Sequence, residues 1–186
     1  MKRGGGAHKG GGFERKMARD LSTWWFNDPG YLWRRPGPGT RFFKNQPHRH
    51  TGDILPQADR RLPYAFPFHV ECKFVKNLDI IKLITDPNKS FINKTWVKAR
   101  EEARNDLDVM LLVKQNHHKE LIFLYRQTYV KLGLDHEGSK IIFIERPTDY
   151  NTDIVIGFAW AFLKKKVNCA KIYFDGTRES KTALGS

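Results

Sequence analysis

The sequence has few cysteines and no long apolar run, and each shortage excludes a class of protein. Its 186 residues include two cysteines, Cys72 and Cys169, which are too few for a disulfide framework and too far apart for a metal-binding pair. The longest apolar run, residues 154–163, is about half of a membrane span. The N-terminus lacks the apolar core of a signal peptide. We therefore expect a cytoplasmic protein with no membrane partner.

Acidic residues are scarce relative to basic ones. Lys and Arg number 33 against 20 Asp and Glu, which gives a formal net charge of +13. This excess is concentrated in residues 1–61, where aromatic residues alternate with basic ones. Such a segment suits a polyanionic partner such as nucleic acid. Two alternatives remain open at this point: a merely basic surface, and aromatic residues that belong to the core.

Composition divides the chain into three expected parts. Residues 1–12 contain six glycines and several basic residues, which is typical of a flexible basic arm. Residues 13–175 have the composition of a single domain, and residues 176–186 form a basic tail that we expect to fray.

Apolar spacing predicts helices and strands within this domain. Phe13, Met17 and Leu21 recur every four residues, so we expect an amphipathic helix from Phe13 to about residue 28. Residues 34–52 are rich in proline, glycine and arginine and predict a basic loop. A second helix is expected over residues 91–105, and strands over residues 52–55, 67–75, 108–113, 121–125, 140–145 and 154–162, of which the last could be helical. The expected fold is an α/β fold with a mixed central sheet flanked by helices.

Two of these strands carry a group of residues suited to phosphodiester hydrolysis. Because side chains alternate along a strand, Glu71 and Lys73 share one face while Cys72 points to the other. Asp53, on the preceding strand, and Glu71 could supply oxygen ligands for Mg²⁺, with the backbone carbonyl of Cys72 as a further ligand. Lys73 would then orient or deprotonate the attacking water, or stabilise the transition state.

A Glu-x-Lys pattern alone is weak evidence, since an ion pair on a solvated sheet produces the same letters. The flanking residues favour a functional role, because Phe68, Val70 and Phe74 indicate a mostly buried strand. Burying a charged pair that has no function would cost free energy there.

These residues resemble a known signature. Gly52-Asp53-Ile54 followed by Val70-Glu71-Cys72-Lys73 is similar to the bipartite motif of the PD-(D/E)xK nuclease superfamily, with Gly52 in place of the proline. Within it the chain resembles archaeal and phage Holliday junction resolvases, which have a glycine-rich start, a Phe-Glu-Arg type motif like residues 13–15 and a basic loop like residues 34–40. The resemblance covers about residues 9–115. It implies a restriction-endonuclease-like fold and a Mg²⁺ cofactor for which Mn²⁺ substitutes.

The resemblance also implies site residues. Glu14 would be the carboxylate of the first helix that faces the metal, directly or through water, although a solvated helix charge is the alternative. Pro38 stands where relatives have serine, which only Thr40 could replace, and Lys98 stands where they have glutamine. The DNA-contacting residues that we predict are Lys9, Arg15, Arg34, Arg35, Thr40, Arg41, Lys44, Arg49 and Lys98.

The function expected from these features is that of a Mg²⁺-dependent, structure-selective DNA endonuclease. It would cut four-way or other branched DNA, as a homodimer with two active sites, in the host cytoplasm if a phage encodes it. Two alternatives remain: a PD-(D/E)xK nuclease of another specificity, restriction-like or active in recombination and repair, and a non-catalytic nucleic-acid-binding protein.

Overall fold

The computed structural model describes residues 5–36, 52–57, 60–103, 106–134, 142–144, 155–163, 170–171 and 173–174. Its elements are, in chain order, α1 (Gly5–Phe26), β1 (Leu32–Arg34), β2 (Ile54–Pro56), β3 (Phe68–Val75), α2 (Ile80–Thr85), the short 3-10 helix η2 (Pro87–Lys89), α3 (Phe91–Glu102), β4 (Asp108–Gln115), β5 (Leu121–Tyr125), α4 (Arg126–Lys131), β6 (Ile142–Ile144), β7 (Val155–Ala159) and α5 (Trp160–Leu163).

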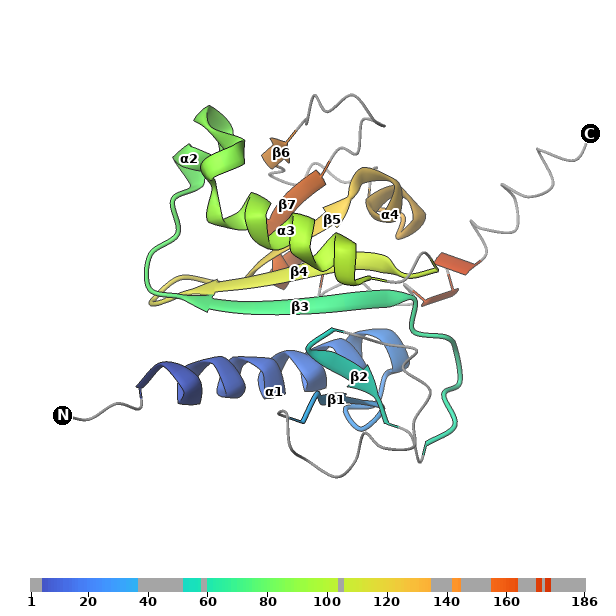
Figure 1. Cartoon of the computed structure of the whole chain (residues 1–186). Coiled ribbons are helices and arrows are strands. Elements are labelled where there is room, and N and C mark those ends of the chain that lie inside the picture. Colours follow the sequence, from blue (N-terminus) through green and yellow to red (C-terminus); the bar gives the residue numbers. More distant parts are fainter. Residues whose placement is uncertain are drawn as a thin grey trace, which may run out of the picture.

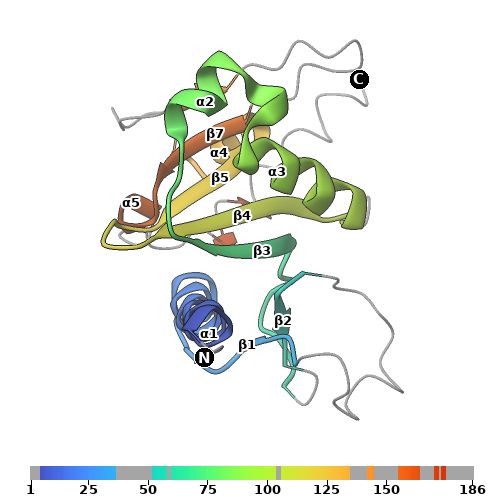
Figure 2. The same cartoon turned by 60° about the vertical axis from the view of Figure 1, so that its left-hand side comes forward.

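Within these ranges the strands form one seven-stranded sheet in the order β1-β2-β3-β4-β5-β7-β6. The central neighbours β3 and β4 run parallel, and the other neighbouring pairs are antiparallel. Helices cover both faces: α1 packs below β3 and α3 lies above the sheet (Figures 1 and 2). The predicted α/β fold with a mixed, helix-flanked sheet is confirmed.

The alternating side chains of the sheet supply two apolar clusters, one on each face. The cluster between α1 and the sheet contains Met17, Leu21, Phe68 and Val70. The other lies between the sheet and α3, whose Ile92, Trp96 and Ala99 pack on alternate residues of β4. Burial of these faces holds both helices on β3 and β4, the two strands at the centre of the sheet.

Helix α1 begins at Gly5, so the prediction that this helix starts at Phe13 is wrong, and residues 5–12 of the expected arm belong to the helix. Adding a turn to an existing helix costs less free energy than starting one, which offsets the poor helix propensity of glycine. Glycine at position 11 leaves room for the Arg34 guanidinium, because an added Cβ would lie 3.2 Å from Nη1 of Arg34. The helix ends near the predicted place, where Asn27 adopts a left-handed φ of 58°.

Several short elements differ from the prediction. Strand β1 and the six-residue helices α2 and α4 were not predicted. The strand predicted over residues 154–162 is β7 followed by α5, and the Trp160 backbone N–H donates to the Glu120 carbonyl where the strand ends. The arm residues 1–4, most of the basic loop (37–51) and the tail 176–186 lie outside the described residues.

A segment near the C-terminal end of the described chain closes the core beneath the sheet. Tyr173 is 6% exposed and packs edge-on against Trp25 of α1 and Phe68 of β3, with ring centroids 5.7 and 5.8 Å away. Its hydroxyl donates a 2.7 Å hydrogen bond to Asp108 at the start of β4. One residue therefore contacts α1 and both central strands.

Candidate active site

Strand β3 carries three polar side chains on the face that α3 covers. His69, Glu71 and Lys73 are in register with residues of β4 that belong to the apolar cluster beneath α3, namely Val109, Leu111 and Val113. Paired residues on neighbouring strands point to the same face. Glu71 and Lys73 therefore share a face as predicted, while Cys72 lies in the cluster on the α1 side.

Asp53, directly before β2, is held against β3 by its backbone and its side chain. Its N–H donates to the Val70 carbonyl (2.7 Å), and its Oδ2 accepts a 2.8 Å hydrogen bond from the Cys72 N–H. The N–H and carbonyl of one strand residue point to the same side of the strand. The Cys72 carbonyl is therefore directed towards the Asp53 side of β3, and the two halves of the motif meet at this residue.

Gly52 explains why the proline of the superfamily name is absent. A Cβ at this position would lie 2.4 Å from the Val70 carbonyl oxygen and 2.8 Å from the Val70 nitrogen. Any other residue, proline included, would push the chain away from β3. Glycine at position 52 thus permits the close approach that places Asp53 beside Cys72.

Burial and neighbouring charge shift the pKa values of this group. Burial raises the pKa of Asp53, and the negative charge of Glu71 raises it further, which outweighs the opposing hydrogen bond from Cys72 and charge of Lys73. Lys73 forms an ion pair with Oε1 of Glu71, whose side chain is 11% exposed. Burial alone would lower the pKa of Lys73, but its hydrogen bond to Glu71 and the two carboxylate charges raise it overall. The Lys73 amine is therefore charged at neutral pH.

Glu14 reaches its neighbours from the opposite side of β3. It lies on α1, and its carboxylate forms an ion pair with Nε of Arg34 on β1. Its charge also raises the pKa of the buried Cys72 thiol, after the larger effects of burial and Asp53. Glu14 thus lies near the middle of the motif, with its carboxylate bound to Arg34.

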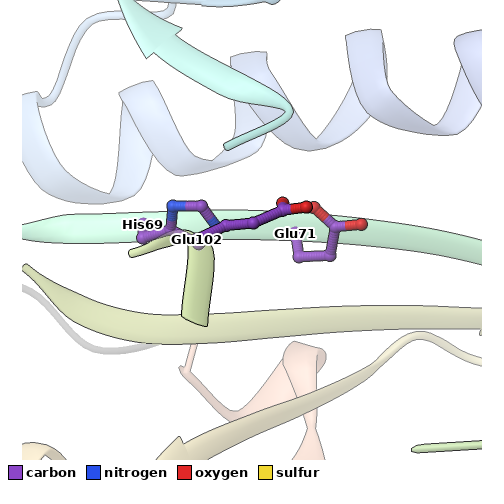
Figure 3. Close-up of side chains that lie close together, drawn as sticks. All are labelled: His69, Glu71 and Glu102. Carbon is purple, nitrogen blue, oxygen red and sulfur yellow. The ribbon is translucent and has the colours of Figure 1, made fainter. Parts of the chain in front are cut away.

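Two residues that the sequence did not single out join Glu71 on the α3 side. His69, Glu71 and Glu102 each offer a ligand atom, and these three atoms lie within 4.8 Å of one another (Figure 3). His69 is 1% exposed, whereas Glu102 lies at the exposed end of α3. Strand alternation could have identified His69, two positions before Glu71. No sequence signal marks Glu102, since only the path of the chain brings the end of α3 over β3.

Basic residues gather on the α1 and β1 side of the molecule. Arg15, Arg19 and Arg34 line a pocket of about 390 Å³, together with Trp33. Lys9 is exposed on α1. The backbone N–H of Arg35 donates a 2.7 Å hydrogen bond to the Asp53 carbonyl. The positive charge of Arg35 adds to burial in lowering the pKa of His69.

The remaining predicted DNA-contacting residues do not lie among these basic residues of α1 and β1. Lys98 lies on the exposed surface of α3, 3.6 Å from a Glu102 carboxylate oxygen. Thr40, Arg41, Lys44 and Arg49 fall outside the described residues.

One of the three comparisons with known proteins identifies a family. The model of the family described as "Phage putative PDDEXK endonuclease" matches residues 6–173. No curated protein and no solved structure matches the chain. In the described part of the chain, no helix has both the length and the apolar character needed to cross a membrane. The matched range contains Asp53, Glu71 and Lys73 together with the mixed sheet that carries them, so the chain belongs to this family of phage PDDEXK endonucleases and has its restriction-endonuclease-like α/β fold.

Proposed function

We propose that this nuclease is a Mg²⁺-dependent endonuclease that cuts branched DNA, with the four-way junction as its main substrate. The observation that carries the chemical part of the proposal is that the charge of Glu71 acts on the partly buried Asp53 carboxylate, and that Lys73 forms an ion pair with Glu71. The junction preference and a homodimer with two active sites rest on the resemblance to resolvases, because two symmetric cuts require two sites.

The donor set fits a hard divalent cation. Asp53 and Glu71 offer carboxylate oxygens, and the Cys72 carbonyl is directed to the Asp53 side of β3. Mg²⁺ prefers oxygen ligands of this kind, and Mn²⁺ accepts them as well. The raised pKa of Asp53 supports the assignment, because two partly buried carboxylates destabilise each other without a positive charge between them.

The residues around these ligands have separate roles in the proposed hydrolysis. When bound, Mg²⁺ supplies a water of lowered pKa and offsets charge on the phosphate. Lys73 is charged at neutral pH, so we assign its ammonium to stabilising the developing negative charge rather than to accepting a proton. Glu71 holds Lys73 at this position through their ion pair.

Basic residues beside the site would hold the DNA backbone. Arg35 is fixed to Asp53 through its backbone and is exposed, which suits contact with a phosphate next to the scissile one. Arg34 is held by Glu14. We therefore propose that Glu14 positions Arg34 for a phosphate contact, in addition to its expected place near the metal. Lys9 and Arg15 extend the same basic surface along α1.

A panel of substrates tests this function. The purified protein is incubated with Mg²⁺ and with linear duplex, flap, fork or four-way junction DNA of equal length, and single-turnover rates are compared. Faster cutting of the junction supports the proposal, and equal rates on linear duplex would assign a nuclease of another specificity. Binding without cutting in either Mg²⁺ or Mn²⁺ would identify a non-catalytic binding protein. Sedimentation of the protein with and without junction DNA tests the homodimer.

A further inference from the structure

We propose that His69, Glu71 and Glu102 form a second cation site, which takes a transition-metal ion such as Mn²⁺ in preference to Mg²⁺. This inference rests on the proposed function in one respect, because Glu71 also belongs to the proposed Mg²⁺ site. The three ligand atoms lie within 4.8 Å of one another on the α3 side of β3. Figure 3 shows the Glu102 carboxylate between the His69 ring and the Glu71 carboxylate.

The path of the chain explains why these residues meet. Strands β3 and β4 are parallel, so α3 must return the chain from the end of β3 to the start of β4. The last turn of α3 therefore lies over the first residues of β3. Glu102 is the last residue of α3, and His69 is the second residue of β3. The cluster follows from the crossover itself and is built on two regular elements.

The chemistry of the donor set favours a transition metal. An imidazole nitrogen suits first-row transition ions, whereas Mg²⁺ binds through oxygen and retains several waters. Mn²⁺ accepts both kinds of donor.

Two residues of the site are buried, and the third is open to solvent. His69 is 1% and Glu71 9% exposed, whereas the Glu102 side chain is 44% exposed. The contact between Glu102 and Lys98 is a surface pair of 3.6 Å, and such pairs contribute little stability. A cation approaching from solvent can therefore displace Lys98 and draw Glu102 towards His69. Waters on the open side would complete its coordination shell.

Metal binding to four forms of the full-length protein tests the site. Mn²⁺ and Mg²⁺ are titrated by calorimetry into the wild type, Glu102→Gln, Asp53→Asn and the matched control Glu101→Gln, which alters the neighbouring exposed carboxylate of α3. We expect the wild type and Glu101→Gln to bind one more Mn²⁺ than Mg²⁺. Glu102→Gln should weaken that additional Mn²⁺ by about tenfold to hundredfold or more. Asp53→Asn should retain it and lose Mg²⁺.

The outcomes separate this inference from the proposed function. Wild-type Mn²⁺ binding by Glu102→Gln would overturn the second site, whatever Asp53→Asn does. Unchanged Mg²⁺ binding by Asp53→Asn would count against the Mg²⁺ site alone. Pulsed electron paramagnetic resonance of bound Mn²⁺ gives an independent measurement, because a coordinated imidazole adds a nitrogen modulation. Loss of that modulation in folded His69→Gln is expected, and its persistence would assign the ion to another histidine and overturn the proposal.

Discussion

The Cys72 N–H donates a 2.8 Å hydrogen bond to Oδ2 of Asp53, although the two residues are 19 positions apart in sequence. This contact ties the carboxylate that precedes β2 to the middle of β3, so the Asp53 side chain is held in position before any ligand binds. Asp53 is also partly buried near the charge of Glu71. A carboxylate held in this way should lower the thermal stability of the metal-free protein and raise that of the metal-bound protein.

Asp53→Asn should abolish Mg²⁺-dependent cleavage and raise the melting temperature of the metal-free protein. The folded-state pKa of Asp53 lies above its unfolded value, so its stabilising contribution is complete below the unfolded pKa and is lost as pH rises through the folded pKa. From about pH 4 upward, the wild type without metal should therefore lose stability relative to Asp53→Asn. A gain of about 1 kcal/mol would appear as about 2–4 °C.

Thermal melts between acid and neutral pH, with and without Mg²⁺, measure this effect. Mg²⁺ should stabilise the wild type but not Asp53→Asn. Asp86→Asn is the control, since the Asp86 carboxylate forms a solvated surface pair with Lys89 and pairs of this kind contribute little stability. A metal-free Asp53→Asn protein that melts below the wild type at neutral pH would show that the carboxylate stabilises the fold, contrary to our assignment.

Lys73→Ala should reduce the single-turnover cleavage rate by about 10²–10³-fold while DNA and metal binding persist. Lys73→Arg should not restore the rate, because a planar guanidinium cannot copy a compact ammonium beside Glu71. If Lys73 served only as the partner of Glu71, its loss would leave a buried carboxylate unpaired and lower stability by about 3–5 kcal/mol. Rate and melting temperature on the same variant therefore distinguish the two roles, and an active but unstable protein would refute the catalytic one.

Gly52→Ala should destabilise the protein by about 1–3 kcal/mol and reduce cleavage, because the new Cβ would lie 2.4 Å from the Val70 carbonyl oxygen. Backbone rather than a flexible side chain blocks the space, so β2 must move and carry Asp53 with it. Gly12→Ala on α1 is the control, since nothing lies within 4 Å of an added Cβ there. That change should stabilise the helix by about 0.5–1 kcal/mol. Equal melting temperatures for the two variants would contradict the packing described at Gly52.

Arg35→Ala should weaken junction binding and reduce the slope of log affinity against log salt by about one unit, as expected for one lost phosphate contact. The combined change of Arg15 and Arg35 to Ala should reduce the slope by about two units. Lys89→Ala serves as the control, because Lys89 is also exposed but lies in η2, between α2 and α3 in the chain rather than on β1 or α1. Fluorescence anisotropy over a range of salt concentrations measures the slope. An unchanged slope in the double variant would locate the DNA surface elsewhere.

Much of this arrangement could be predicted from the sequence, because periodic patterns report burial directly. The four-residue spacing of Phe13, Met17 and Leu21 identified the buried face of α1, and two-residue alternation placed Glu71 and Lys73 together on β3. These predictions concern residues within one helix or strand, where the spacing in sequence determines which side chains share a face.

What could not be predicted depends on contacts between elements. Glu102 joins His69 only because α3 returns over β3, and no local pattern encodes that path. Residues 5–12 belong to α1, where Arg34 of β1 lies beside Gly11, whereas composition alone indicated flexibility. Asp53 was predicted from its motif, but its bond to Cys72 became visible only in the structure.

The position of Tyr173 has a consequence for synthesis of the protein on the ribosome. Trp25 and Phe68 emerge early, but the ring that packs against both of them and the hydroxyl that binds Asp108 belong to a residue made more than 60 positions later. Until that residue leaves the exit tunnel, the part of the apolar cluster between α1 and the sheet that Tyr173 covers, beside Trp25 and Phe68, lacks its last aromatic ring. The strand that carries Glu71 and Lys73 therefore gains its contact with Tyr173, through Phe68, only when translation has passed position 173.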